Sequence, residues 1–195
     1  MFIVTRRALA LAALGAAALA VTAAPAAAQL GGVNPFSIGV SGGAAVPVGD
    51  GSRNLNTGFS VDGIVAVRVP TSPISLRAEV GYTRFDIKDA PSSAEARRRI
   101  ISGVANLVLT LPGGPASVVR PYLIGGVGAY NGKGSQRFGD TRVEGAGETK
   151  LGVNGGVGIE IPLSGITGFG EVRYTSIFTE GTNTNFVPIR FGIRF

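Results

Sequence analysis

The sequence contains no cysteine, no histidine and no tryptophan among its 195 residues. Without cysteine, the chain forms no disulfide and offers no thiolate for catalysis. Without histidine, it lacks the most common general base and the most common metal ligand of proteins. We therefore expect no metal site, no cofactor and no catalytic residues.

The charged residues are also few. The chain has 18 Lys and Arg against 12 Asp and Glu, a formal net charge of +6. These charges form no basic stripe with interleaved aromatic residues, which is the usual pattern of a nucleic-acid-binding surface. We therefore expect no nucleic-acid partner.

Long hydrophobic runs are missing, apart from a short one at the amino-terminus. Residues 8–21 are all Ala, Leu, Gly or Val and follow two arginines. This run is shorter than the roughly 20 residues that a membrane-spanning helix needs. A basic start, a short apolar core and the small residues at 25–28 are typical of a secretory signal peptide. We predict cleavage after Ala28, giving a signal peptide (1–28) and one domain (29–195).

The last eleven residues alternate between two faces. The apolar face consists of Val187, Ile189, Phe191, Ile193 and Phe195, and the other consists of Phe186, Pro188, Arg190, Gly192 and Arg194. A period of two is the pattern of a β-strand with one apolar face. A strand of about ten tilted residues is long enough to cross the hydrocarbon core of a bilayer.

Eight segments have this strand-like character after the predicted signal peptide. They are 36–48, 59–69, 74–85, 100–111, 119–130, 150–161, 166–176 and 185–195. The alternation in 119–130 is too weak to assign its faces. The connections alternate between long and short, which is typical of membrane barrels with long external loops and short periplasmic turns. We expect residues 86–98 to be a polar loop, with a helical turn at 92–99, and 131–148 to be the longest loop.

Several motifs resemble those of the small bacterial outer-membrane β-barrel family, of the OmpA transmembrane-domain and OmpX type. They are Gly42-Gly43-Ala44, Arg120-Pro121-Tyr122, Gly152-x-Asn154-Gly155-Gly156-x-Gly158-x-Glu160, Glu171-x-Arg173-Tyr174 and the terminal strand. The resemblance implies an all-β, eight-stranded antiparallel up-and-down barrel in the outer membrane. It also implies that Phe191, Ile193 and Phe195 form the signal read by the barrel assembly machinery. The missing tryptophan is a departure, because the family places aromatic girdles at the membrane interfaces.

Charged residues recur at the inward-facing positions of the predicted strands. They are Asp62, Arg68, Arg77, Glu79, Lys150, Glu160, Glu171, Arg173, Arg190 and Arg194. The lumen of an eight-stranded barrel is just wide enough for side chains to fill. An isolated buried ion costs several kcal/mol, so such charges must be paired. We interpret the set as a structural ion-pair network, with a narrow pore or a catalytic site as the alternatives.

The strand glycines have a structural interpretation as well. Gly132-Lys133-Gly134 lacks the glycine spacing and the Ser or Thr of a phosphate-binding loop. Glycine in a strand instead allows another group to approach closely. We therefore expect the inward glycines to make room for bulky side chains opposite them.

Three consecutive arginines, Arg97, Arg98 and Arg99, lie beside the second long connection. Arginine forms bidentate contacts with phosphate, so these residues are candidates for contact with lipopolysaccharide. The alternative is a solvated loop, because exposed charges usually contribute little.

These observations favour a non-enzymatic protein of the cell outer membrane that presents surface loops. We expect a monomer with outer-membrane lipid, lipopolysaccharide and the assembly machinery as partners. One alternative is a lipid-modifying enzyme, with an unusual Ser or Tyr nucleophile, or a narrow pore. Another is a soluble periplasmic carrier of the lipocalin type, which would point Val61, Val153 and Ile193 inward.

Overall fold

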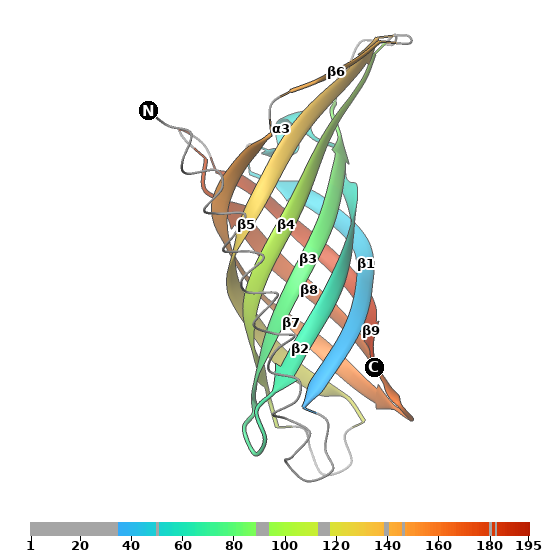
Figure 1. The fold of residues 1–195 in the computed structure, drawn as a ribbon, viewed down its shortest axis with the longest axis vertical. Helices are drawn as coiled ribbons and strands as arrows, with labels where there is room; N and C mark the ends of the chain where they lie inside the picture. The colour runs from blue at the N-terminus through green and yellow to red at the C-terminus, as the bar shows by residue number, and fades with distance from the viewer. Residues whose placement is uncertain are drawn as a thin grey trace. The chain divides into compact units, whose positions relative to one another are not determined.

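The computed structural model describes residues 35–49, 51–88, 94–112, 118–138, 141–145, 147–179, 181 and 183–195. The predicted signal peptide lies outside these residues. The strands are β1 (Phe36–Val48), β2 (Gly58–Arg68), β3 (Ile74–Asp86), β4 (Ala94–Thr110), β5 (Arg120–Phe138), β6 (Thr141–Glu144), β7 (Glu148–Leu163), β8 (Ile166–Ile177) and β9 (Thr184–Arg194), and a short helix, α3 (Gly51–Asn54), follows β1 (Figure 1).

The strands form a closed antiparallel barrel. Each of β1, β2, β3, β4, β5, β7, β8 and β9 pairs with its neighbour along the chain, and β9 pairs with β1 to close the ring. The last residue takes part in this closure, because the Phe195 N–H donates to the Ile38 carbonyl at 2.8 Å. The short strand β6 pairs only with the far end of β5 and is not part of the ring. The predicted eight-stranded up-and-down barrel is confirmed.

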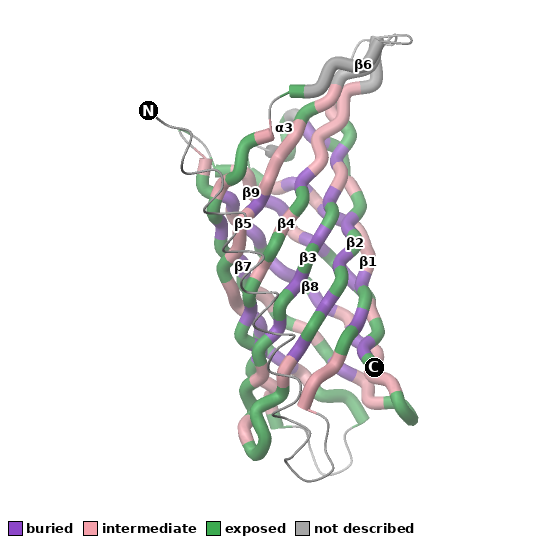
Figure 2. The backbone as a smooth tube through the Cα atoms, in the orientation of Figure 1, coloured by how far each residue is buried: buried purple, intermediate pink, exposed green. Residues whose placement is uncertain are grey.

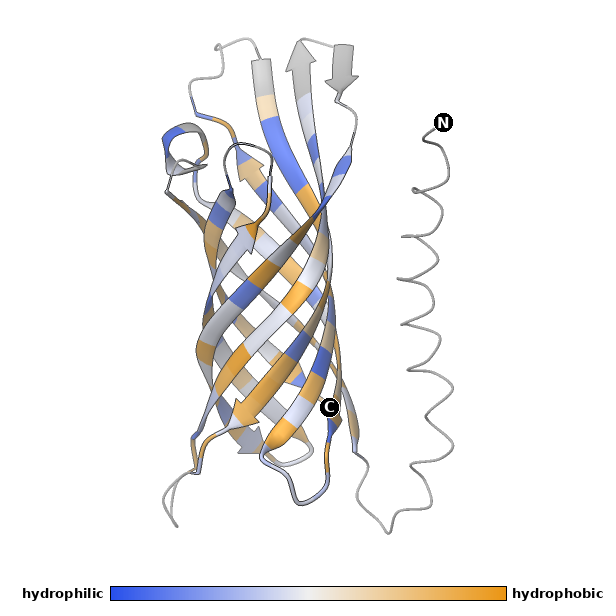
Figure 3. Ribbon diagram, turned by 90° about the vertical axis from the view of Figure 1, so that its left-hand side faces the viewer, coloured by the Kyte–Doolittle hydropathy of each residue, from blue (hydrophilic) through white to orange (hydrophobic). Residues whose placement is uncertain are grey.

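Buried and exposed residues alternate along the strands of the ring (Figure 2). On β2, Val61 is 53% exposed and Val65 is 39% exposed, whereas Asp62 and Ile64 are each 3% exposed. Apolar and polar positions alternate in the same way in the hydropathy view (Figure 3). Val153 and Ile193 also point outward, so the apolar face is turned to the surroundings, which is the reverse of a soluble carrier.

Two strands extend at least six residues beyond the segments that the sequence pattern predicts. β4 begins at Ala94 rather than Ile100, and β5 ends at Phe138 rather than Tyr130. The helical turn predicted at 92–99 is therefore wrong over its described residues, and most of the longest predicted loop is a hairpin. The two extensions pair with each other along their whole length. Their backbone hydrogen bonds stabilise a polar segment that has no apolar face to identify it as a strand.

The connections β1–β2, β3–β4, β5–β7 and β8–β9 lie at one end of the barrel, which we call the loop end. The other end is the turn end, and two of its three connections, β2–β3 and β7–β8, are shorter than any connection at the loop end. At the loop end the lumen holds an apolar cluster rather than polar side chains. Its buried members are Ala45, Leu55, Phe85, Ile100, Tyr130, Ile177 and Phe186. The Phe85 and Phe186 rings meet edge to face, with their centroids 5.6 Å apart. The lumen is therefore closed by packed apolar side chains at this end.

The first connection takes part in this closure. Leu55 follows α3, pairs as an isolated bridge with Ile87 and is buried in the apolar cluster. The Asn56 N–H donates to the Asp86 carbonyl at 2.8 Å, and the Lys88 ammonium donates to the Ser52 carbonyl at 2.8 Å. Backbone and side-chain hydrogen bonds thus hold the loop against the end of β3.

The structure also resolves the faces of β5, which the sequence left open. Leu123 and Val127 point outward, whereas Tyr122, Ile124 and Tyr130 are buried in the lumen. Both faces of this strand are therefore apolar, with small residues between, so period-two alternation of polarity is absent.

A glycine makes room for the largest inward side chain of β5. Tyr122 lies directly opposite Gly158 of β7, and a Cβ atom at Gly158 would overlap the tyrosine ring. This close approach is the role that we predicted for the inward glycines.

We predict that Gly158→Val destabilises the barrel by about 1–3 kcal/mol, because the added side chain displaces the Tyr122 ring. Gly155→Val is the matched control, since a Cβ atom there points outward and meets nothing closer than 4.0 Å. That control should be neutral or slightly stabilising. Urea unfolding of the refolded proteins in vesicles measures both, and equal losses of stability would show that lumen packing is not the reason for the glycine.

Candidate functional site in the barrel lumen

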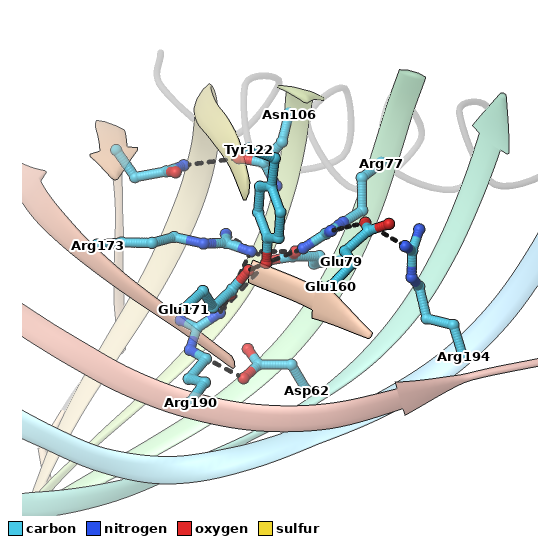
Figure 4. A network of polar contacts seen from close by, with 11 residues as sticks. Asp62, Arg77, Glu79, Asn106, Tyr122, Glu160, Glu171, Arg173, Arg190 and Arg194 are labelled. Atoms are coloured by element: carbon cyan, nitrogen blue, oxygen red, sulfur yellow. Dashed lines mark hydrogen bonds and ion pairs between the residues drawn. The ribbon is translucent and has the colours of Figure 1, made fainter. Parts of the chain in front are cut away.

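Among the residues whose burial the structure describes, eight charged side chains are buried in the lumen (Figure 4). They come from five strands and are Asp62, Glu79, Glu160, Glu171, Arg77, Arg173, Arg190 and Arg194. Four are acids and four are bases, so their formal charges cancel. This balance is what a filled lumen requires, because an uncompensated buried charge is strongly destabilising.

The network centres on two strands on opposite sides of the ring. β3 and β8 are four strands apart in either direction around the barrel. Arg173 of β8 makes a bidentate contact with Glu79 of β3, with N–O distances of 2.5 and 2.8 Å. Arg77 of β3 donates to Glu171 of β8 at 2.9 Å. Two charge-assisted contacts thus cross the lumen and connect opposite walls of the barrel.

The arginines of β9 extend this network in both directions. The Arg190 Nε lies 3.3 Å from an Asp62 carboxylate oxygen, and its Nη1 lies 3.4 Å from Glu79. Arg194 forms an ion pair with Glu160, which also lies 4.0 Å from Arg77. Each buried base therefore has an acidic partner on another strand.

Neutral side chains complete the surroundings of the charges. The Tyr122 hydroxyl donates to Glu171 at 2.8 Å. The Arg77 guanidinium lies 5.4 Å from the Tyr122 ring centroid and 5.3 Å from that of Phe169, within the range of cation–π attraction. Nearby, the Asn154 amide donates to Asn106 at 2.9 Å. The charges are thus held between aromatic faces and amide groups.

Two predicted members of the network lie outside it. Arg68 is at the last position of β2, at the turn end, and is exposed. Lys150 is only partly buried and pairs with the exposed Glu148 at 2.5 Å. Both stand at positions that alternate with the outward residues of their strands and therefore face the lumen. Both also lie near strand ends, where long basic side chains reach water. The alternation of a strand shows which way a side chain points, but not how far it lies from the ends of the barrel.

Several network residues were missed from the sequence. Tyr122 was missed because the faces of its strand could not be assigned, and Phe169 and Asn106 because they carry no charge. One signal was present and unused: β3 carries Arg77-x-Glu79, and β8 carries the reversed order, Glu171-x-Arg173. β3 and β8 run in the same direction on opposite walls of the barrel. The reversed order of the two residues therefore places each arginine opposite a glutamate of the other strand.

The arrangement is suited to filling space and neutralising charge. Among the described residues, no group of three or more Asp, Glu, His or Cys side chains is placed to hold a metal ion. Within the same part of the chain, no helix is long and apolar enough to cross a membrane. Each of the four buried bases has an acidic partner in the lumen, which avoids the penalty of an unpaired buried charge.

The other predicted site residues lie on the outside. Phe191 and Ile193 point outward on β9, and Phe191 is 70% exposed. Phe195 directly follows the strand and is also exposed. Arg97 and Arg99 have the outward parity of β4, whereas Arg98 has the inward parity and lies near Gly132. The three arginines are therefore split between two faces of the strand.

Comparison with known proteins agrees with this geometry. A family model described as outer membrane protein beta-barrel domain matches residues 9–195. The crystal structure of Neisserial surface protein A is similar with a TM-score of 0.59 and 22% identity, over 84% of this chain and 97% of that chain. A major outer membrane protein from Thermus thermophilus has a TM-score of 0.56 and 12% identity, over 82% of this chain and 98% of that chain. No curated protein sequence matches significantly.

We predict that Arg173→Met lowers the free energy of unfolding by about 3–5 kcal/mol, because it removes the bidentate partner of the buried Glu79 carboxylate. The double variant Arg173→Met/Glu79→Gln should be less destabilised than this single variant, because it restores the charge balance of the lumen. Urea unfolding in vesicles measures the free energy of unfolding of both variants. The folded fraction at each urea concentration is read from the heat-dependent shift of the barrel on gels.

The ion pair between the partly buried Lys150 and the exposed Glu148 provides the control. Glu148→Gln should cost less than about 1 kcal/mol, because solvent screens this contact. A double variant that is at least as unstable as the sum of its single variants would contradict the account of the network.

Proposed function

The chain belongs to the outer-membrane β-barrel family, and on that premise we propose that it is a non-enzymatic scaffold that presents loops at the cell surface. The observation that carries this proposal is the filled lumen. Charged side chains pair across its middle, and apolar side chains pack across its loop end. A closed lumen favours a structural role over a pore.

The long connections are the parts that the scaffold presents. In outer-membrane barrels the longer loops are extracellular and the shorter turns are periplasmic. We assign the loop end to the outside of the cell on this basis. The start of β4 and the end of β5 pair with each other at this end, and the first connection is held against β3 by hydrogen bonds. These two segments are the preformed surfaces available to an external partner.

Export and assembly follow from the same proposal. Residues 1–28 direct secretion and are removed after Ala28. The outward side chains of Phe191, Ile193 and Phe195 are available to the assembly machinery before the terminal strand closes the ring. The protein then functions as a monomer, because every strand of the ring has two paired edges and the sheet has no open edge to share.

Two measurements test this function. The mature protein, refolded into planar bilayers, should give no stable ion conductance, because the lumen charges are paired and its loop end is packed.

In cells, the protein should fractionate with the outer membrane, begin at Gln29, and expose an epitope inserted at Ser52 to antibody on intact cells. A reproducible open channel, or release in the soluble periplasmic fraction, would contradict the proposal.

A further inference from the structure

Three arginines face the lumen at the turn end of the barrel, below the ion-pair network. They are Arg68 of β2, Arg120 of β5 and Arg194 of β9, and we call them the turn-end arginines. Each alternates along its strand with outward apolar residues, so its side chain points into the lumen. Arg68 and Arg120 are exposed, whereas Arg194 is buried.

The turn-end arginines lie at nearly the same height, although they are far apart in the sequence. Following the paired residues once round the ring from Ser37 leads back to β1 at Pro47, ten residues further along. The pairing thus climbs ten residues over eight strands, or 10/8, about 1.25 residues per strand. With this climb taken into account, the three arginines lie within about two strand residues, or about 5 Å, of one height.

The three side chains also approach from well-separated directions. Around the ring, β2 and β9 are two strands apart, β9 and β5 are three apart, and β5 and β2 are three apart. A ring of eight strands spaced about 4.8 Å apart and tilted by about 40° is roughly 16 Å across. Each arginine has to cover at most half of this width, so all three guanidinium groups can surround one compact group on the axis.

Positive charge exceeds negative charge at this height. Among the described residues, Glu160 is the one acidic side chain at this level, and it is paired with Arg194. Within the same part of the chain, neither Arg68 nor Arg120 forms an ion pair. The connections β2–β3, β4–β5 and β7–β8 contain no Asp or Glu. Even if the α-carboxylate of Phe195 is counted, three bases face two acids.

Arg194 carries a donor that the fold leaves without an acceptor. The residue is 6% exposed, and its Nη2 contacts Glu160. Its Nε has no hydrogen-bond partner among the residues that the structure describes. A buried donor without an acceptor costs free energy. An anion held between the arginines would supply the missing acceptor.

The level directly above the turn-end arginines is filled by buried side chains. Val108 and Tyr122 are each 1% exposed, and Phe169 is 5% exposed. The guanidinium groups of Arg77 and Arg194 lie 5.3 and 5.9 Å from the Phe169 ring centroid. An anion that enters from the turn end therefore stops beside the three arginines and does not pass through the barrel.

We propose that Arg68, Arg120 and Arg194 bind the phosphate group of a soluble phosphate monoester in the periplasm. The periplasmic source rests on the proposed orientation, with the loop end outside the cell. A guanidinium group matches phosphate geometry with two parallel N–H donors. A phosphate monoester carries about two negative charges at pH 7 and has three unesterified oxygens. It can therefore offer one oxygen to each arginine, whereas the phosphodiester of a lipid headgroup has only two such oxygens and one charge.

The test uses the mature protein in maltoside micelles, which contain no phosphate, at 0.15 M salt. Isothermal titration calorimetry measures the binding of glycerol 3-phosphate. Wild-type protein should bind one molecule per barrel. The variant Arg68→Gln/Arg120→Gln should bind at least about tenfold more weakly, because it loses two charge-assisted contacts. Glycerophosphoglycerol, a phosphodiester with the structure of a lipid headgroup, should bind wild-type protein more weakly than the monoester does.

The variant Arg53→Gln/Lys88→Gln is the matched control, because it removes two exposed positive charges from the loop end. It should bind glycerol 3-phosphate as wild type does. The heat-dependent gel shift verifies that each variant is folded, and Arg68→Gln and Arg120→Gln are measured singly if the double variant does not fold.

Three results would overturn the inference. They are a lack of saturable binding of glycerol 3-phosphate, an equal loss of binding in the two double variants, and binding of the phosphodiester that is as tight as that of the monoester. The last result would assign the site to a lipid headgroup. The scaffold function would still stand in each case, because conductance and cell fractionation are measured separately.

Discussion

The structure depends on the pairing of every backbone polar group inside a layer that contains no water. A sheet achieves this only if it has no edge, so the first and last strands must meet. Here the pairing of the first and last strands extends to the last residue, because the backbones of Phe195 and Ile38 are hydrogen-bonded to each other. Once the ring is closed, each strand has one face toward lipid and one toward a narrow lumen, and the alternation of the sequence follows from that division.

The lumen then has to be filled by side chains that the strands point inward. Where these are charged, they must cancel, and the opposed order of Arg77-x-Glu79 and Glu171-x-Arg173 allows two ion pairs to cross between opposite walls. Glycine supplies the remaining space, as Gly158 does for the Tyr122 ring. The same charges that suggest a channel in the sequence thus act as the core of the folded protein.

The sequence was sufficient for the strands whose two faces differ in polarity. Segments 36–48 and 185–195 were predicted to within a residue, because lipid on one side and a polar lumen on the other impose a clear period. The start of β4 and the end of β5 were not predicted, because beyond the apolar band neither face of a strand must be apolar. Arg68 was assigned to the buried ion-pair network, but it is exposed at the end of β2. Strand alternation gives the direction of a side chain and not its distance from the end of the barrel.

The most direct test of this account is the orientation of a single tryptophan in a chain that has none. Phe191→Trp and Phe186→Trp both lie on β9, one pointing outward and the other into the lumen. In vesicles of brominated lipid, the account predicts strong quenching of tryptophan fluorescence for Phe191→Trp and little for Phe186→Trp. Equal quenching, or stronger quenching of Phe186→Trp, would contradict it.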